Sequence, residues 1–380
     1  MPAAILQLEL SAPLPAIAGC ERYDQLFLVC RWHGRVVGTR WVPLDGGAID
    51  PRRLAAAVRA AMTWPAWRLW LEETLGWDPR HRAGARPPSI SVAVCTRDRP
   101  DDLARVLEAL ASLRGPVREI LVIDNAPSTD DTQRLVARRP GVRYVREPRA
   151  GLDAARNRAL AEARGDIVAF TDDDAIPEPG WAEALAADFG DPRVLAVCGL
   201  TLPLELETEP QVWFERHCPF GRGFARHVFD AWSDNPLAAG SVGAGANFAI
   251  RREVIERVGG FDERLDAGTP TRSGGDHEMF SRILAAGYRI VYEPAAVSWH
   301  RHRRTRAALR GAVFGYGAGV YATFAQQLVE RREIGVVRRA WVWLRRGQLP
   351  ALVASVRRTP GSVPIDVILA ELAGCAAGPW

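Results

Sequence analysis

The sequence predicts an α/β protein built on a mixed, mostly parallel sheet, with a small α+β unit before it and helices after it. From residue 89 onward, short apolar segments alternate with amphipathic ones, as strands and helices do in a parallel sheet with right-handed crossovers. The chain after residue 303 is rich in arginine and has a helical pattern. We therefore expect three parts, at residues 1–86, 89–303 and 304–380.

The composition indicates a globular protein with a large core. The chain has 380 residues, of which 48% are hydrophobic and 25% charged, and its net charge of +4 is small for this length. Its cationic side chains are arginines, which we attribute to genome composition, and we expect no nucleic-acid partner. The six cysteines form no CxxC pair, which is typical of reduced thiols in a cytoplasmic protein.

Two segments bear on the location of the protein. Residues 1–14 lack a basic region followed by a long apolar core, so no signal peptide is expected. Residues 311–329 carry no charge but are rich in glycine and alanine, which favours a packed helix or one on a membrane surface over a spanning helix. We expect a cytoplasmic protein. For the Arg-rich C-terminal helices the alternatives are a solvated face and peripheral contact with the inner face of the plasma membrane.

The first part has its own strands and helix. Residues 25–30 and 35–43 flank His33-Gly34 as the strands of a hairpin do, and Asp50 is suited to cap the helix that follows. Four tryptophans come next, and we expect them to pack at a domain contact, with sugar binding as the alternative. They are Trp64, Trp67, Trp70 and Trp77. Residues 83–88 have the composition of a linker.

The second part has a regular first half and a less regular second half. Its predicted strands are 90–95, 119–123, 142–145, 167–170, 194–202, 246–250, 289–292 and 296–299. Its predicted helices are 100–113, 129–139, 151–164, 251–258 and 275–286. Residues 211–232 are aromatic and basic, and we expect a long ordered loop or a short helix there.

Three consecutive acids, Asp172, Asp173 and Asp174, end one of the apolar strand segments. Burying three carboxylates without partners is costly, so they should face water or a cation at the sheet edge. Alternate residues of an extended chain point the same way, so Asp172 and Asp174 can converge on one ion while Asp173 turns away. Carboxylate oxygens suit Mg²⁺ or Mn²⁺, and the alternative is a solvated acidic turn.

Polar residues also follow two other predicted strands. Thr96, Arg97 and Asp98 end the first strand, and Asp124 ends the second. The carboxyl ends of parallel strands meet at one edge, where ligands of such sheets bind, so these residues should lie beside the acidic run. Arg156, near the start of the helix at 151–164, could reach a phosphate or sugar there.

Several segments together resemble successive landmarks of the family-two, inverting, nucleotide-sugar-dependent glycosyltransferases. The matching segments are 92–96, 120–125, 151–157, 167–174, 245–252, 259–262 and 275–278. The resemblance covers about residues 89–300 and implies a Rossmann-like fold of the glycosyltransferase A type. It also implies a nucleotide-sugar donor, most often a UDP-sugar, and a glycan, lipid-linked or small-molecule acceptor.

The resemblance implies roles for the donor side of the site. Thr96 and Asp124 would contact the nucleoside, and the nucleotide-sugar pocket would also include Arg97, Asp98, Arg156, Asp172 and Asp173. Asp172, Asp174 and His300 would hold Mg²⁺ or Mn²⁺. The alternative for His300 is a hydrogen-bonded histidine beside His302.

On the acceptor side, the resemblance makes Asp276 the catalytic base, with Glu278 as a second carboxylate. An inverting transfer needs one carboxylate to take the proton of the attacking hydroxyl. A helix cap is a further role for Asp276. Many relatives have Glu directly before this Asp, whereas this chain has Gly275, which puts acceptor contacts from that position in doubt.

We therefore predict a metal-dependent inverting glycosyltransferase that adds one sugar. A Gln-x-x-Arg-Trp motif, usual in processive members, is absent from the sequence. One alternative is a sugar-nucleotide nucleotidyltransferase, which would need a glycine-rich loop after the first strand, where residues 96–100 have none. Another is an inactive nucleotide-sugar-binding module, which would lack the base or the acids. A zinc site at His217, Cys218 and His227 has poor ligand spacing.

Overall fold

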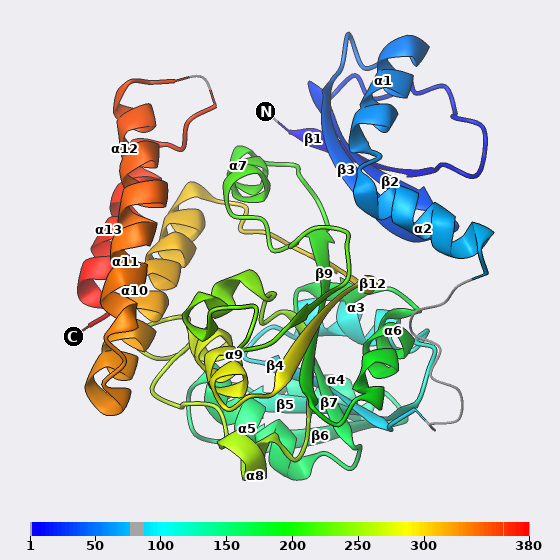
Figure 1. Ribbon diagram of the computed structural model, residues 1–380. Coiled ribbons are helices and arrows are strands. Elements are labelled where there is room, and N and C mark those ends of the chain that lie inside the picture. Colours follow the sequence, from blue (N-terminus) through cyan, green and yellow to red (C-terminus); the bar gives the residue numbers. More distant parts are fainter. Residues whose placement is uncertain (1, 77–86, 360, 380) are drawn as a thin grey trace.

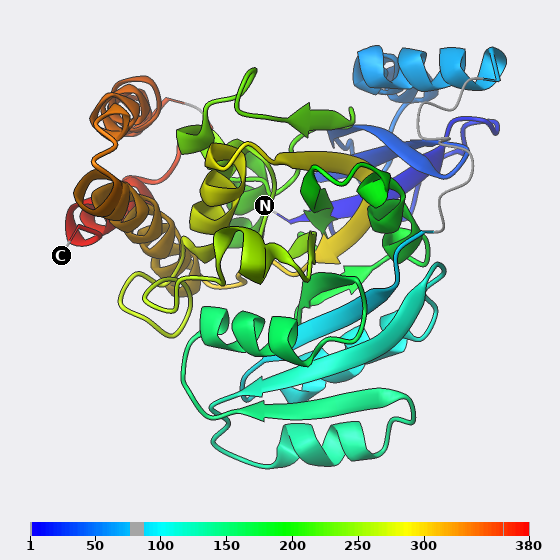
Figure 2. The ribbon, with the colours of Figure 1, turned by 60° about the horizontal axis from the view of Figure 1, so that its bottom comes forward.

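A computed structural model describes residues 2–76, 87–359 and 361–379 and contains two sheets. Figure 1 shows the smaller sheet, in blue, on one side of the larger one, and the C-terminal helices, in orange and red, on the other. The view in Figure 2 has the same arrangement. The larger sheet therefore forms the centre of the molecule.

The smaller sheet belongs to the N-terminal part and has the predicted hairpin. Its strands are β1 (Ala3–Glu9), β2 (Gln25–Trp32) and β3 (Arg35–Pro43), with β2 antiparallel to β3 and parallel to β1. Helices α1 (Pro51–Ala61) and α2 (Trp64–Thr74) pack on it. The side chain of Asp50 accepts from the backbone N–H of Arg52 at 2.8 Å, so its predicted capping role is confirmed.

The expected packing of the tryptophans is wrong for three of them. Helix α2 faces its sheet with Ala66 and Leu69, so the other side of the helix carries Trp64, Trp67 and Trp70, which are 66%, 52% and 42% exposed. Trp77 and most of the predicted linker lie outside the described residues.

The larger sheet begins with four parallel strands, as predicted. These are β4 (Ile90–Thr96), β5 (Val117–Asn125), β6 (Val142–Glu147) and β7 (Ile167–Asp172). The intervening helices are α3 (Pro100–Leu110), α4 (Asp131–Ala137) and α5 (Leu152–Glu162). Apolar side chains on both faces of these strands are buried, because helices cover the sheet on both sides.

The second half makes the sheet mixed. Its strands are β8 (Ala175–Pro177), β9 (Val194–Pro203), β10 (His227–Phe229), β11 (Asn247–Arg251) and β12 (Arg289–His300). The order along the sheet is β10-β12-β9-β11-β7-β4-β5-β6, with β8 paired to β12. Strand β11 is antiparallel to both of its neighbours, β7 and β9, whereas β12 is parallel to β9. The predicted mixed, mostly parallel sheet is confirmed.

Several elements of this half differ from the sequence prediction. The two short strands expected at 289–299 form the single strand β12, with a bulge between Glu293 and Val297. The segment 211–232, expected to be a long ordered loop or a short helix, contains most of α7 (Glu209–His217) and also the unexpected strand β10. The helices not yet named are α6 (Trp181–Ala187), which was not predicted, α8 (Val254–Val258), α9 (Gly275–Ala285), and the 3-10 turns η1 (Asp188–Gly190) and η2 (Pro236–Ser241).

The C-terminal part is helical, as predicted. It consists of α10 (Arg306–Arg331), α11 (Gly335–Trp343), the π-helical turn η3 (Leu344–Gln348), α12 (Leu349–Val356) and α13 (Ile365–Ala377). Helices α10 and α13 pack closely through glycines. Among the described residues, every helix is too short or too polar to cross a membrane.

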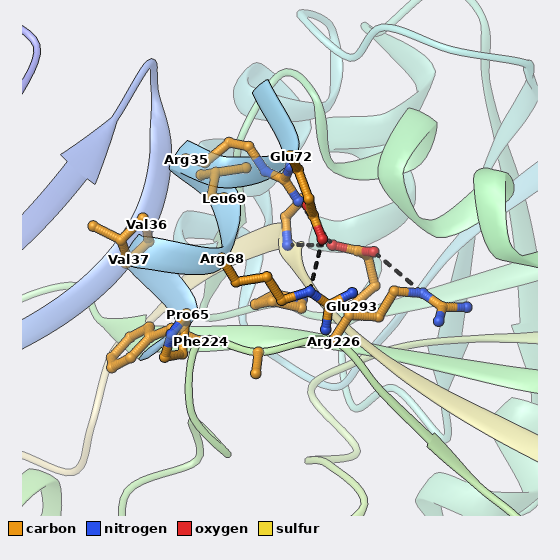
Figure 3. Close-up of a pocket in the computed structure, with 13 residues that line it drawn as sticks. Arg35, Val36, Val37, Pro65, Arg68, Leu69, Glu72, Phe224, Arg226 and Glu293 are labelled. Atoms are coloured by element: carbon orange, nitrogen blue, oxygen red, sulfur yellow. Dashed lines mark hydrogen bonds and ion pairs between the residues drawn. The ribbon is translucent and has the colours of Figure 1, made fainter. Parts of the chain in front are cut away.

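A small cavity marks the junction between the two sheets. Figure 3 shows Arg35 from β3 and Arg226 from the segment before β10 around Glu293 in the bulge of β12. The ion-pair distances to Glu293 are 3.9 Å from Arg35 and 3.8 Å from Arg226. The cavity holds only about 50 Å³, too little for a sugar nucleotide. These ion pairs, together with apolar side chains such as Phe27 and Val36 that join the core of the larger sheet, attach the N-terminal part.

Candidate active site

The structure brings the three polar strand ends to one edge of the larger sheet. Thr96 at the end of β4 pairs in register with Asp124 on β5, and the neighbouring Cys95 pairs with Asp172 on β7. These residues are far apart in the chain, and only the parallel order of β5, β4 and β7 makes them neighbours. This edge contains the carboxyl ends of the parallel strands, where ligands of such sheets bind.

Asp172, Asp174 and His300 form a compact group at this edge. One potential ligand atom from each lies within 4.8 Å of the other two. Pairing of β8 with β12 places His300 opposite Ala175, directly after the acidic run. The Nε2 atom of His300 lies 3.2 Å from Oδ1 of Asp174.

Asp173 points away from this group, as the alternation of an extended chain predicts. Its carboxylate accepts a hydrogen bond from Oγ1 of Thr96 at 2.7 Å and another from Arg99 at 3.0 Å. Arg99 also donates to Asp174 at 3.2 Å. Asp173 therefore joins the ends of β4 and β7.

Charge within the group is unevenly balanced. Burial, and next the charge of Asp174, raise the pKa of Asp172 to about 7. Burial also acts on Asp174, but the charge of His300 and its hydrogen bond outweigh it and lower the pKa of Asp174 below its usual range. Two carboxylates and an imidazole held this closely fit a divalent cation that accepts oxygen and nitrogen ligands.

A second layer of side chains orients His300. Its Nδ1 atom lies 3.2 Å from Nδ1 of His302, and Nε2 of His302 lies 3.0 Å from Oε2 of Glu215 on α7. Burial raises the pKa of Glu215 to about 8. Sequence reasoning missed Glu215, since no pattern in its segment, expected to be a loop or a short helix, pointed to a site; the alternation of His300 and His302 was the available signal.

Asp124 provides a buried acceptor at the other end of this edge. The hydroxyl of Tyr144 donates to its Oδ2 at 2.9 Å, while its Oδ1 is buried and has no hydrogen-bond partner among the described residues. Burial raises the pKa of this carboxyl. An unpaired buried oxygen is costly unless a ligand donates to it, so this atom suits an N–H group of a nucleobase.

Arg97 and Asp98 lie in the exposed turn after β4. Asp98 has a positive φ of 55°, and its carboxylate accepts from the backbone N–H of Ser128 at 2.8 Å. It therefore ties the turn after β4 to the turn after β5. The Nε atom of Arg97 lies 3.9 Å from Asp98 and the side chain is half exposed, so it is free to move toward a ligand.

Arg156 lies at the same end of the sheet but is buried in an ion cluster. Its Nη1 donates to Asp153 at 2.8 Å and to Asp266 at 2.7 Å. Burial works against its charge, but these carboxylates outweigh it and raise the pKa of Arg156, while burial raises that of Asp153. The sequence analysis did not include Asp153 and Asp266, whose meeting depends on how α5 packs against residues 259–275.

Asp276 lies in the first turn of α9, half exposed. The cap of the helix is Gly274, with φ of 108°, so the alternative role of Asp276 as the cap is wrong. A Cβ atom on Gly245 would lie 2.7 Å from Oδ2 of Asp276 and 2.9 Å from Nη2 of Arg156. The carboxylate and the guanidinium are therefore close neighbours across Gly245.

Glu278 and Gly275 have different surroundings from those the resemblance implied. Glu278 is buried and accepts from Arg282 at 2.7 Å, with Arg331 at 3.2 Å, so it faces these arginines rather than Asp276. A Cβ on Gly275 would come within 1.9 Å of Oδ2 of Asp153. The carboxylate of Asp153 therefore fills the space that a side chain at position 275 would need.

The remaining candidates do not form a site. His217 stacks on Trp213, with a centroid separation of 4.8 Å, and His227 lies 3.5 Å from Asp234. Within residues 2–76, 87–359 and 361–379, the acidic cluster with His300 is the only group with metal-ligand geometry. The loop at 268–275, just before Asp276, packs against Gly315 and Gly319 of α10.

Known proteins resemble this chain in sequence and fold. Residues 91–259 match the family described as Glycosyl transferase family 2. The pre-mycofactocin glycosyltransferase of Mycobacterium tuberculosis is 30% identical over 266 residues, 70% of this chain and 53% of that protein. The chain thus spans about half the length of that relative. Glycosyltransferase AglE of Haloferax volcanii is 25% identical, with 73% of this chain and 88% of that protein covered.

A solved structure resembles the chain over most of its length. It is the mannosyltransferase PcManGT from Pyrobaculum calidifontis, in complex with GDP-Man and Mn²⁺. The TM-score is 0.52 at 20% identity, covering 86% of this chain and 97% of that one. This likeness confirms the predicted fold of the glycosyltransferase A type. The sequence matches show that the chain contains a domain of glycosyl transferase family 2.

Proposed function

We propose that the protein is a metal-dependent inverting glycosyltransferase that moves one sugar from a nucleoside-diphosphate sugar to an acceptor hydroxyl. One observation supports this most strongly: the group of Asp172, Asp174 and His300 and the half-exposed Asp276 lie at one end of the sheet around Arg156. A cation held by Asp172, Asp174 and His300 would bind the donor diphosphate, and the acceptor hydroxyl would approach Asp276.

The donor side follows from the residues at the strand ends. The unpaired Oδ1 of Asp124 would accept from the base of the nucleotide. Asp172, Asp174 and His300 would hold Mg²⁺ or Mn²⁺, which supplies charge neutralisation for the leaving diphosphate. UDP is the proposed nucleotide, with GDP and dTDP as the alternatives in the experiment below.

On the acceptor side, Asp276 would take the proton of the acceptor hydroxyl as its oxygen attacks the anomeric carbon. Its position across Gly245 from Arg156 places the carboxylate next to a permanent positive charge. Arg156, held by Asp153 and Asp266, would position Asp276 rather than bind phosphate directly.

The experiment is a screen for donor hydrolysis and transfer with UDP-, GDP- and dTDP-sugars in the presence of Mn²⁺. We expect turnover with one nucleotide class. Asp276→Asn should reduce transfer by at least about a hundredfold while nucleotide binding stays unchanged. Asp131→Asn, which alters an exposed aspartate on α4, serves as the control. The absence of both turnover and metal-dependent nucleotide binding would contradict the proposal, and full activity of Asp276→Asn would contradict the assignment of the base.

A further inference from the structure

A second cavity, of about 570 Å³, lies beside α9 and has four arginines in its wall. It is bounded by η2, α9, the end of α10, and α11, which contact one another. The charged residues that line it are Arg331, Glu333, Arg338, Arg339 and Arg346. Four guanidinium groups and one carboxylate make its wall strongly positive.

Most of this positive charge is not neutralised by the protein. Arg331 lies 3.2 Å from Glu278, whereas Arg338, Arg339 and Arg346 form no ion pair with any described residue. Guanidinium groups converging on a cavity suit an anion with several oxygens, because each can donate two parallel hydrogen bonds to it. The volume exceeds that of a phosphate ion and could hold a phosphate ester.

The cavity lies on a different face of α9 from the candidate active site. Five residues separate Asp276 from Ser281 on the cavity wall, and this turns the helix by about 140°. Neither Asp276 nor Gly245 lines the cavity. A ligand in it would therefore occupy a site of its own.

We propose that this cavity is a separate binding site for the phosphate group of a small-molecule or lipid phosphate ester, beyond the proposed function. Ile334, Val337 and Trp341 next to the cavity are 78%, 59% and 57% exposed, a surface that a lipid chain could cover. Both sources of phosphate share the same recognition chemistry and are separated in the test.

The test measures binding to the protein saturated with UDP and Mg²⁺, so that the donor edge is occupied. Methyl phosphate, titrated by calorimetry, is the soluble probe. Vesicles of phosphatidylcholine with and without phosphatidic acid, in a sedimentation assay, are the lipid probe. The double variant Arg338→Gln/Arg339→Gln is compared with Arg345→Gln/Arg357→Gln, which removes two exposed arginines of the same helical region outside the cavity wall.

We expect the first double variant to weaken binding of at least one probe by about tenfold or more, and the control variant by less than about twofold. Weaker binding of methyl phosphate identifies a soluble phosphate ester as the ligand, and weakening confined to phosphatidic acid vesicles identifies a lipid phosphate. Equal weakening by both double variants, or no binding of either probe, would overturn the inference. Failure of the wild-type protein to bind UDP would contradict the proposed function. It would leave this inference open to test, because phosphate binding can also be measured without nucleotide.

Discussion

At the scale of single residues, Gly245 controls the distance between the candidate base and its positive neighbour. A side chain at this position would collide with both Asp276 and Arg156, at 2.7 and 2.9 Å. Neither group can withdraw easily, because Arg156 is held by two buried carboxylates and Asp276 lies in the first turn of a helix. The absence of a side chain here is therefore part of the geometry of the site.

Gly245→Ala should lower the transfer rate by on the order of a hundredfold, because a displacement of the base by about 1 Å is enough to misalign it. Binding of UDP and Mn²⁺ should change little. Gly240→Ala is the matched control, since a Cβ atom there meets no other atom within 4 Å. Steady-state kinetics on both variants test this, and unchanged transfer by Gly245→Ala would show that Asp276 does not need its observed position.

His277, the neighbour of Asp276, should make stability depend on pH. Burial, and next the charge of Arg339, lower its pKa to about 4, against 6.5 in the unfolded chain. Between these values the unfolded chain binds a proton that the folded protein does not, so stability falls as the pH falls from about 6.5 to about 4. The loss is about 3 kcal/mol in total.

Chemical unfolding at several pH values measures this effect. The variant His277→Gln should show a smaller decrease in the free energy of unfolding over that range, by up to about 1.4 kcal/mol per pH unit. His33→Gln, which alters an exposed histidine of the N-terminal hairpin, should retain the full decrease. The same slope in His277→Gln and in the wild-type protein would show that His277 is not the group responsible.

At the scale of elements, the sequence predicted those parts of the site that depend on local pattern. The ends of β4, β5 and β7 follow from apolar segments that stop at polar residues, and their meeting follows from parallel order. The buried cluster of Asp153, Asp266 and Arg156 could not be predicted, because it depends on how α5 packs against a distant loop. The same holds for β10, whose short segment forms a strand only by pairing with β12.

The packing of α10 against α13 is a further element-scale feature that local pattern does not show. A Cβ atom on Gly374 of α13 would lie 2.0 Å from the backbone oxygen of Phe314, and one on Gly317 of α10 would lie 2.4 Å from that of Glu371. Only residues without a side chain allow the two helix backbones to approach so closely. These glycines therefore determine how the C-terminal helices attach.

Gly374→Ala should lower the free energy of unfolding by about 1–3 kcal/mol, since backbone atoms must move apart to accept the methyl group. Gly311→Ala, at a position of α10 with no neighbour within 4 Å, should be neutral or stabilising by up to about 1 kcal/mol. Thermal unfolding of the two variants decides the matter. Equal stability of both would mean that α13 does not pack on α10 as observed.

At the scale of the whole molecule, the N-terminal part connects to the strand that carries His300. Glu178, just after β8, binds Arg31 of β2 and accepts from Nε1 of Trp299 at 2.8 Å. Glu207 makes a second connection, to Arg22 and Tyr23, without contacting β12. Two carboxylates therefore attach the same unit, but only Glu178 also contacts the metal-side strand.

Glu178→Gln should raise the Mn²⁺ concentration needed for half-maximal donor hydrolysis by about threefold to tenfold, because the support of β12 beside His300 weakens. Glu207→Gln should weaken the attachment of the N-terminal part without this shift. Mn²⁺ titrations of hydrolysis by both variants separate the two effects. A shift of equal size in both would indicate that attachment alone, rather than the contact with Trp299, affects the metal site.

The central claim is that Asp172, Asp174 and His300 hold the cation that binds the donor diphosphate. The most direct test measures Mn²⁺ binding by electron paramagnetic resonance in the presence of UDP. Wild-type protein should bind one Mn²⁺ per chain, and Asp174→Asn and His300→Ala should each weaken that binding by about tenfold or more, whereas Asp131→Asn should not. Mn²⁺ binding of unchanged strength in Asp174→Asn and His300→Ala would contradict the account.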